Sequence, residues 1–546
     1  MAACNYSDKK FLIVDSFKPS RDVLKNLAFD LSPESVEASG YANDVITRCK
    51  GQRYDILLLG YDLGENQKNG QQLLEELRAT GLVDRNTVVI LVTGEMSQAM
   101  VLAALEHKPD DYLTKPYTIG ELSKRLNRCF MKKKRMRDIY SALDQNQPKL
   151  AISLCDKAIE SNTPYRLECL GIKSRQYFEL GLYDHASRIY KAHQNMSNCQ
   201  WAGVGLGKIE LKRNNPEKAI KYFSQIKEKY PIYLINYDWL ATAYEDLLQF
   251  IEAEETLEEA IAISPLSVKR IKRYADLCFK NGNFSKATNA YDKNYSLSFN
   301  SIHHKPDNAL QFAYAATEYC DDLGELELKR LKNKVVSALS ETTKTFNQIP
   351  TKIQSQLLTV GLMEKTKDKQ FAQRLLTSTE SLLEKNLALL NSEEGLRVAK
   401  LLIDLGRRPP ANTVLNKVVE KSHNSLSIMT EVDKLVDETI EITSQQAAQT
   451  ALDDALDYYH RKDYIASITK LEEARKLYPK HLGITLNLVQ VLLTDYEENH
   501  RHVRSLQKAG KLLNKVGPLP ASNSAHVRQK ALEYKFKQLY ANQHYI

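Results

Sequence analysis

The chain has 546 residues, of which 43% are hydrophobic and 26% charged, a composition that is ordinary for a folded globular protein. Its net charge of +8 is small for this length and does not by itself indicate a nucleic-acid partner. Eight cysteines without CxxC or paired Cys/His spacing argue against a disulfide framework or a zinc site and indicate reduced, structural cysteines.

Targeting and catalytic motifs are absent from the sequence. The first residues show no basic region followed by a long apolar run, and the longest apolar runs are too short to cross a bilayer. No Walker loop, GxSxG, HExxH or GxGxxG motif occurs. We therefore expect a cytoplasmic, non-enzymatic protein with no membrane partner and no cofactor.

The first 130 residues alternate between strand and helix patterns. Short apolar runs predict strands at 10–16, 34–39, 54–60, 87–94 and 110–116. Helical spacing of apolar residues predicts helices at 20–31, 42–52, 70–81, 97–108 and 118–139. Because the strand runs lack strict alternation and the two patterns take turns, we expect an α/β domain with a doubly wound, five-stranded parallel sheet.

In such a sheet the reactive groups gather beyond the carboxyl ends of the strands. The predicted strand ends carry Asp15, Ser16, Gly60, Thr93, Tyr112 and Lys115. Their order and spacing, in the segments FLIVD, LVTGE and DDYLTKP, resemble the receiver domain of bacterial response regulators, which has the CheY-like fold. The resemblance covers roughly residues 8–130. It implies that two adjacent acids and a phospho-accepting Asp would hold Mg²⁺, that Thr93 and Lys115 would contact the phosphoryl group, and that Tyr112 is the aromatic switch position.

The sequence departs from the receiver pattern at two positions. The acid pair is reduced to Asp15 followed by Ser16, and Gly60 stands where the family has its phosphate acceptor. Aspartyl phosphorylation needs a carboxylate nucleophile, and Mg²⁺ needs hard oxygen ligands. We therefore predict a phosphorylation-deficient pseudo-receiver with no catalytic residues and with weak or absent Mg²⁺ binding.

Two alternatives stay open for this pocket. Asp62 lies two residues beyond a strand end and could replace the acceptor if its side chain folded back into the pocket. The retained residues could also be structural, with Asp15 and Lys115 forming an ion pair and Thr93 capping a helix.

From about residue 136 onward the sequence predicts helices only. Units with a period of about 34 residues occupy 136–300, with small residues where two helices cross and Pro after the second helix. They resemble tetratricopeptide (TPR) repeats and imply an all-α superhelix. Segment 147–164 is interpreted as the second helix of a unit whose first helix is the tail of the last receiver helix. We expect degenerate or plain paired helices at 301–445, and a further unit, closed by Pro479, with a helical cap at 446–546.

The concave face of such an array is lined by the first helix of each repeat. In the expected register this face carries Lys208, Lys212, Asp238, Lys272 and Lys280, a set that could bind an acidic peptide or consist of ordinary solvated charges. The basic run KKKRMR at 132–137 is interpreted as a solvated helix face, with an acidic or nucleic-acid partner as the alternative. The segment GVGLGKIEL at 203–211 is interpreted as close helix packing, and His303-His304 as a loop pair.

The whole layout resembles proteobacterial receiver–TPR response regulators, including VieB-type auxiliary regulators. This resemblance implies a two-component adaptor that binds a sensor histidine kinase or a response regulator and inhibits phosphotransfer, with a second protein or peptide partner in the repeats. The alternatives are a response regulator phosphorylated at Asp62 and a general TPR assembly cofactor with a purely structural receiver. Nucleic acid is not an expected partner, because no DNA-reading module follows the receiver.

Overall fold

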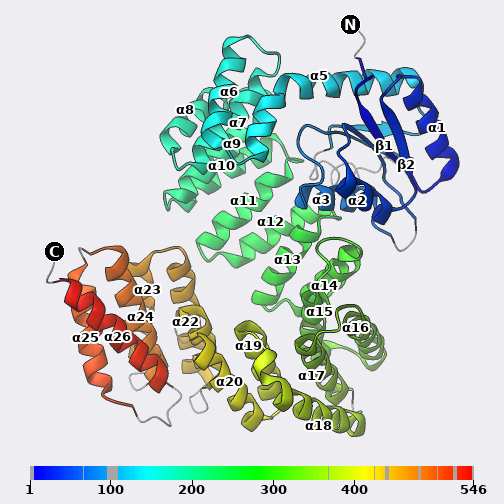
Figure 1. Cartoon of the computed structure of the whole chain (residues 1–546). Helices are drawn as coiled ribbons and strands as arrows, with labels where there is room; N and C mark the ends of the chain where they lie inside the picture. Colours follow the sequence, from blue (N-terminus) through cyan, green and yellow to red (C-terminus); the bar gives the residue numbers. More distant parts are fainter. Residues whose placement is uncertain are drawn as a thin grey trace. The chain divides into compact units, whose positions relative to one another are not determined.

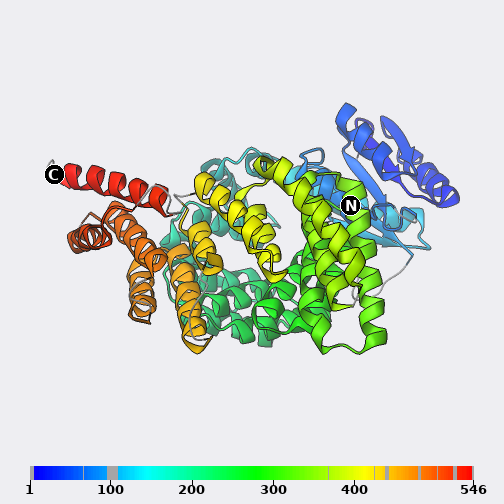
Figure 2. The same cartoon turned by 90° about the horizontal axis from the view of Figure 1, so that it is seen from below.

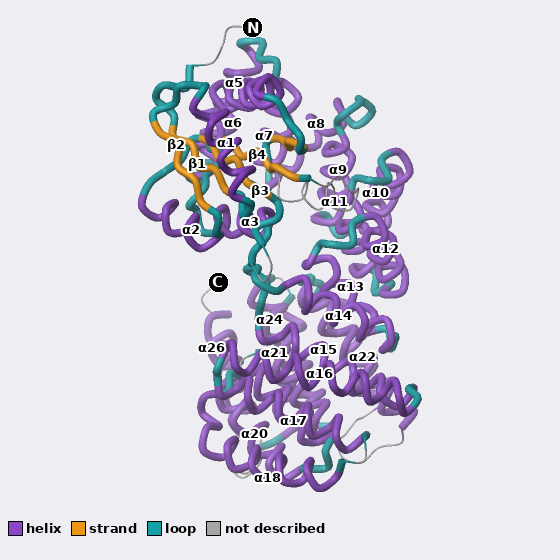
Figure 3. The backbone as a smooth tube through the Cα atoms, turned by 90° about the vertical axis from the view of Figure 1, so that its right-hand side faces the viewer, coloured by secondary structure: helices purple, strands orange, loops and turns teal. Residues whose placement is uncertain are grey.

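The computed structural model describes residues 5–64, 67–94, 109–366, 368–422, 425–436, 442–477, 481–500, 502–519 and 525–543. The helix predicted at 97–108 and the predicted role of Pro479 fall outside these residues. The chain divides into two compact units, Met1–Asn308 and Ala309–Ile546, and all described strands lie in the first (Figure 3). Within the described parts, no helix is both long and apolar enough to cross a membrane.

The first unit begins with a five-stranded parallel sheet in the order β2-β1-β3-β4-β5 (Figure 1). Its strands are β1 (Lys10–Val14), β2 (Ser35–Ser39), β3 (Ile56–Gly60), β4 (Val88–Thr93) and β5 (Asp111–Thr114). The helices that the structure describes in this domain are α1 (Lys18–Phe29), α2 (Ala42–Gly51), α3 (Gly70–Ala79) and α5 (Ile119–Asp144). The predicted α/β order is thus confirmed, with β3 in the middle of the sheet.

The sheet is buried on both faces, which explains why its strands read as continuous apolar runs. Successive side chains of a strand point to opposite faces. Leu59 accordingly joins the cluster that contains Leu73 of α3, whereas Leu58 joins the cluster that contains Leu122 of α5. In register, Leu59 pairs with Val14 on one side and with Leu91 on the other.

Helix α5 connects the sheet domain to the helical region without a break. A capping box between Thr118 and Glu121 fixes its start, and it continues for 26 residues. Its first half covers the sheet, and its second half packs through Met136 and Ile139 onto Cys155 of α6 (Pro148–Glu160) (Figure 1). The predicted sharing of one helix between the two regions is confirmed.

Antiparallel helices complete the first unit. They are α7 (Arg166–Glu179), α8 (Tyr183–His193), α9 (Gln200–Lys212), α10 (Pro216–Lys229), α11 (Leu234–Asp246), α12 (Phe250–Ile263), α13 (Val268–Lys280) and α14 (Phe284–Ser298). A Cβ atom added to Gly205 would overlap the ring of Tyr190, and one added to Gly207 would overlap the ring of Phe223. The glycine-rich segment therefore serves close helix packing, as predicted.

The remaining helices also pack in pairs, such as α17 with α18 and α19 with α20, and the paired helices can be followed in Figure 2. They are α15 (Pro306–Tyr319), α16 (Glu325–Phe346), α17 (Ile349–Lys365), α18 (Lys369–Asn386), α19 (Ser392–Asp404), α20 (Arg408–Ser422), α21 (Leu426–Val436), α22 (Ile442–His460), α23 (Tyr464–Leu477), α24 (Leu482–Glu498), α25 (Val503–Val516) and α26 (His526–Gln543), with short 3₁₀ turns at Cys320–Asp322 and Leu387–Leu389.

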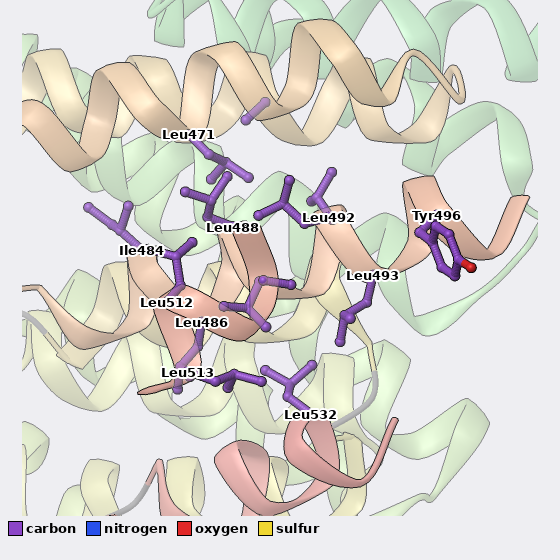
Figure 4. Packing of buried hydrophobic residues seen from close by; sticks show 14 of the residues in the cluster. Leu471, Ile484, Leu486, Leu488, Leu492, Leu493, Tyr496, Leu512, Leu513 and Leu532 are labelled. Atoms are coloured by element: carbon purple, nitrogen blue, oxygen red, sulfur yellow. The ribbon is translucent and has the colours of Figure 1, made fainter. Parts of the chain in front are cut away.

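Helix α24 is the centre of the C-terminal core. It is buried on nearly all sides, through apolar residues and a few polar ones such as Asn487 and Gln490. Its Leu488 lies near Leu471 of α23, while its Leu486 lies toward Leu513 of α25 and Leu532 of α26 (Figure 4). The last hundred residues therefore have a hydrophobic core of their own.

Candidate functional site

The pocket at the carboxyl ends of the strands is built around Asp15, which is only 2% exposed. Its Oδ2 accepts hydrogen bonds from Lys115 Nζ at 2.7 Å and from Ser20 Oγ at 2.8 Å. Its Oδ1 accepts from the backbone N–H of Phe17 at 2.9 Å, and Arg21 donates to its backbone carbonyl at 2.6 Å. Both carboxylate oxygens are thus used by donors of the protein itself.

Gly60 ends β3 beside Asp15 and is enclosed by backbone. An added Cβ would lie 2.9 Å from the carbonyl oxygen of Val14 and 3.5 Å from Cγ of Asp15. Helix α3 begins equally close, since a Cβ at Gly70 would overlap the carbonyl of Gly60. The position therefore lacks a carboxylate and also lacks room for a side chain unless the backbone shifts.

Ser16 and Asp62 interact with each other and with their own loop. Ser16 Oγ donates to the backbone carbonyl of Asp62 at 3.1 Å. The exposed carboxylate of Asp62 accepts from the backbone N–H of Gly64 at 2.9 Å, which is the geometry of an Asx turn. This turn directs the carboxylate into its own loop.

The residues of this pocket do not fit Mg²⁺. The ion requires an octahedral set of oxygen ligands, usually with more than one carboxylate when the protein supplies the charge. Asp15 is the one carboxylate among the strand-end residues, and its oxygens already bind the ammonium group of Lys115 and the hydroxyl of Ser20. In the described chain, no group of three or more His, Cys, Asp or Glu side chains could hold a metal ion.

Thr93 and Tyr112 complete the predicted set. Thr93 is buried at the end of β4 and pairs in register with Thr114 of β5. Tyr112 packs against the core between the sheet and α3, where burial raises the pKa of its hydroxyl. That hydroxyl makes no hydrogen bond within the described residues. The structure therefore brings Asp15 and Lys115 into direct contact and leaves Tyr112 directed into the core.

The receiver domain contacts the repeats a second time, through α3. Gln72 Nε2 donates to two backbone carbonyls in segment 297–299, at 3.3 and 3.1 Å. Glu75 Oε1 lies 3.2 Å from Nζ of Lys269 and 2.8 Å from Nε2 of His303. We call these contacts the α3 clasp. His303, one of the two histidines predicted as a loop pair, thus has an acidic partner on the receiver, Glu75, far away in the sequence.

Two of the predicted groove residues are engaged within the array. Lys208 Nζ lies 4.5 Å from the ring centroids of both Phe178 and Trp239, and burial lowers its pKa. Asp238 accepts two hydrogen bonds of 2.9 Å from the buried guanidinium of Arg270. Arg270 was not among the residues predicted from the sequence. Two features could have pointed to it: it lies one repeat after Asp238, and the N–H groups of a guanidinium are arranged to bind a carboxylate with two parallel hydrogen bonds.

The other three groove residues differ in their surroundings. Lys272 pairs with Asp276 one turn along its own helix, at 2.8 Å. Lys280 Nζ lies 3.5 Å from the ring centroid of Phe250, and Lys212 is exposed. The five residues therefore do not form one continuous row of solvated charges.

The basic run at 132–137 is only partly solvated. Lys133 is buried, with Nζ 2.8 Å from a carboxylate oxygen of Asp110 and 2.5 Å from the backbone carbonyl of Arg85. Its interpretation as part of a solvated face is wrong, because α5 turns this side chain toward the sheet domain. Lys134 and Arg137 are exposed, as predicted.

Comparison with known proteins agrees with this architecture. Residues 11–127 match the family profile described as response regulator receiver domain. The N-terminal domain has a CheY-like receiver fold. Residues 201–231 match a tetratricopeptide repeat, and the long helical region is consistent with a TPR array.

The relatives found cover the receiver domain. The chemotaxis protein CheY-3 of Vibrio cholerae is 25% identical over 130 residues, which are 24% of this chain and 98% of that protein. The CheY-like response regulator receiver domain protein of Methanospirillum hungatei JF-1 is 22% identical, with 24% of this chain and 98% of that chain covered and a TM-score of 0.22. The receiver domain of Francisella response regulator 1452 is 24% identical, with 23% and 98% covered and a TM-score of 0.21.

Proposed function

We propose that this chain is a non-enzymatic, cytoplasmic two-component signalling adaptor whose receiver domain does not accept a phosphoryl group. The observation that carries the proposal is the closed pocket, in which Gly60 offers no nucleophile and Asp15 is bonded to Lys115. Formation of an aspartyl phosphate requires a carboxylate at the reacting position. A receiver without this chemistry keeps its sheet and helices, and with them its surfaces for protein contacts.

The partner proposed for the receiver is a sensor histidine kinase or a response regulator, bound at the face around α1. Four large apolar side chains there are at least half exposed: Phe17, Val23, Phe29 and Tyr41. Large apolar side chains exposed on one helix and beside its ends favour a protein contact there. An adaptor bound to the kinase would compete with the cognate regulator and so inhibit phosphotransfer.

A phosphotransfer assay tests this proposal. A sensor kinase and its regulator from the same genome are incubated with ATP and increasing amounts of the full chain. We expect transfer to the regulator to fall, and the double variant Val23→Glu/Phe29→Glu to inhibit at least about tenfold less well, because two charges would be buried in the contact. Ile251→Glu is the matched control, since Ile251 is 64% exposed in the repeats. Unchanged transfer and no binding for every kinase–regulator pair would remove the proposal.

The α3 clasp supports a second candidate function, that of a general assembly cofactor whose receiver braces the repeats. Glu75 is only 14% exposed and holds both Lys269 and His303. In this case the repeats would bind their protein partner without any kinase. The two functions are distinguished by Val23→Glu/Phe29→Glu, which should abolish kinase binding in the first and leave partner binding intact in the second.

A further inference from the structure

A groove of about 1900 Å³ follows α5 along the edge of the sheet opposite the Asp15 pocket. It is lined by residues of segments 5–9, 53–55 and 84–87, which precede β1, β3 and β4, by residues of α5 between 120 and 141, and by Tyr165. These segments are the amino ends of the strands, whereas Asp15 lies at a carboxyl end. We call this feature the α5 groove.

The lining of the α5 groove contains more basic side chains than carboxylates. Eight basic side chains and four carboxylates line it. Asp8 and Asp55 pair with Lys9, and Asp84 pairs with Arg53. The fourth carboxylate, Glu121, caps its own helix by accepting from the backbone N–H of Thr118. Lys9 is shared by two of these carboxylates, and the groove lining as a whole still has more basic side chains than carboxylates.

Three of the basic side chains are left without an ion pair in the described chain: Lys124, Lys134 and Arg137. The others are engaged, since Arg125 and Arg128 bind Asp111 and Lys133 binds Asp110. All three cations are exposed and project from one helix over about four turns. Lys134 and Arg137 are neighbours one turn apart on α5, whereas Lys124 projects from another side of the helix. Arg137 also interacts electrostatically with Asp8.

Apolar surface lies between these cations. Phe130, Met131 and Tyr165 line the groove, and Met131 is 39% exposed. Phe130 is fixed by its contact with the ring of Tyr6, at a centroid distance of 5.5 Å. An exposed apolar side chain beside cations matches a ligand that carries both carboxylates and an apolar side chain.

We propose that the α5 groove binds an acidic peptide segment of a partner protein, with its carboxylates on Lys134 and Arg137 and an apolar side chain against Met131. Charge complementarity and the exposed apolar side chain of Met131 favour this occupant. The binding weakens as salt rises, because both cations are exposed.

The test uses the full chain and fluorescence anisotropy. The probe is a labelled peptide of repeated Glu-Glu-Leu units, compared with Glu-Glu-Ser, Lys-Lys-Leu and an oligothymidylate of equal length. We expect saturable binding of the Glu-Glu-Leu peptide, weaker binding of Glu-Glu-Ser and none of Lys-Lys-Leu. The variant Lys134→Glu/Arg137→Glu should weaken binding at least about tenfold.

The matched control is Lys218→Glu/Lys221→Glu in α10, which has the same spacing, exposure and change of charge. It should change the affinity less than about twofold, and circular dichroism checks that both double variants remain helical. Equal losses in the two double variants would overturn the proposal, as would the absence of saturable binding. Tighter binding of oligothymidylate with the same dependence on Lys134 and Arg137 would reassign the groove to nucleic acid. Normal peptide binding by the variant Val23→Glu/Phe29→Glu would show that the α5 groove binds the peptide independently of the α1 face.

Discussion

Replacing Lys115 with Met should destabilise the receiver domain. Its Nζ lies 2.7 Å from Oδ2 of Asp15, a distance at which opposite charges attract by roughly 6 kcal/mol with an effective dielectric constant of about 20. Much of this attraction is offset by desolvation of the carboxylate. Removing one partner of a buried pair costs about 3–5 kcal/mol, and because the Lys115 side chain is 32% exposed we expect about 2–3 kcal/mol.

Hydrogen exchange of the full chain, followed at the amides of β1 and β3, measures this loss. Local exchange is preferable to a melting curve because a chain with several domains does not unfold in one step. Asp15→Asn should remove most of the effect of Lys115→Met, since a neutral amide needs no cation. Lys50→Met, at an exposed site of α2, is the matched control and should change stability by less than about 0.5 kcal/mol. If Lys115→Met were as well protected as this control, the ion pair would not hold the pocket together, and our account of the pocket would be wrong.

Three further perturbations test other parts of the structure. Gly60→Asp should lower the exchange protection of β3, because its Cβ meets a backbone carbonyl of β1 at 2.9 Å. This variant should still give no phosphoryl adduct. A stable, phosphorylated variant would show that the pocket opens and that an acid at the position of Ser16 is dispensable. Glu75→Gln should speed amide exchange in segment 301–304 and leave the sheet unchanged, whereas unaltered exchange there would mean that the α3 clasp contributes little. Gly205→Val should cost about 1–3 kcal/mol in the repeats because the ring of Tyr190 occupies the space, and a neutral effect in urea unfolding would contradict the close crossing of α8 and α9.

The fold of the receiver domain was predictable because its strands are short apolar runs separated by helical patterns. Each of the five predicted strands contains a strand of the structure, and β3 is fully buried, as its run of apolar residues indicates. The absence of a nucleophile was equally visible, since Gly60 can be located by counting along a strand. The space around Gly60 was not predictable, because it depends on how closely Val14 and Gly70 approach its backbone.

Contacts between distant segments account for what sequence patterns missed. Glu75 and His303 are 228 positions apart, and no periodicity links a receiver helix to a loop after α14. The pairing of Asp238 with Arg270 depends on the stacking of consecutive repeats. The burial of Lys133 depends on the side of α5 that faces the sheet domain, and a run with five basic residues in six positions conceals that difference.

Intact mass of the full chain after incubation with acetyl phosphate and Mg²⁺ tests most directly the claim that this receiver cannot be phosphorylated. We predict an unchanged mass, in the wild-type chain and in Asp62→Asn alike, because Gly60 offers no carboxylate and Asp62 is held in its own turn. A stoichiometric phosphoryl adduct on the wild-type chain would contradict the claim, and its loss in Asp62→Asn would identify the acceptor.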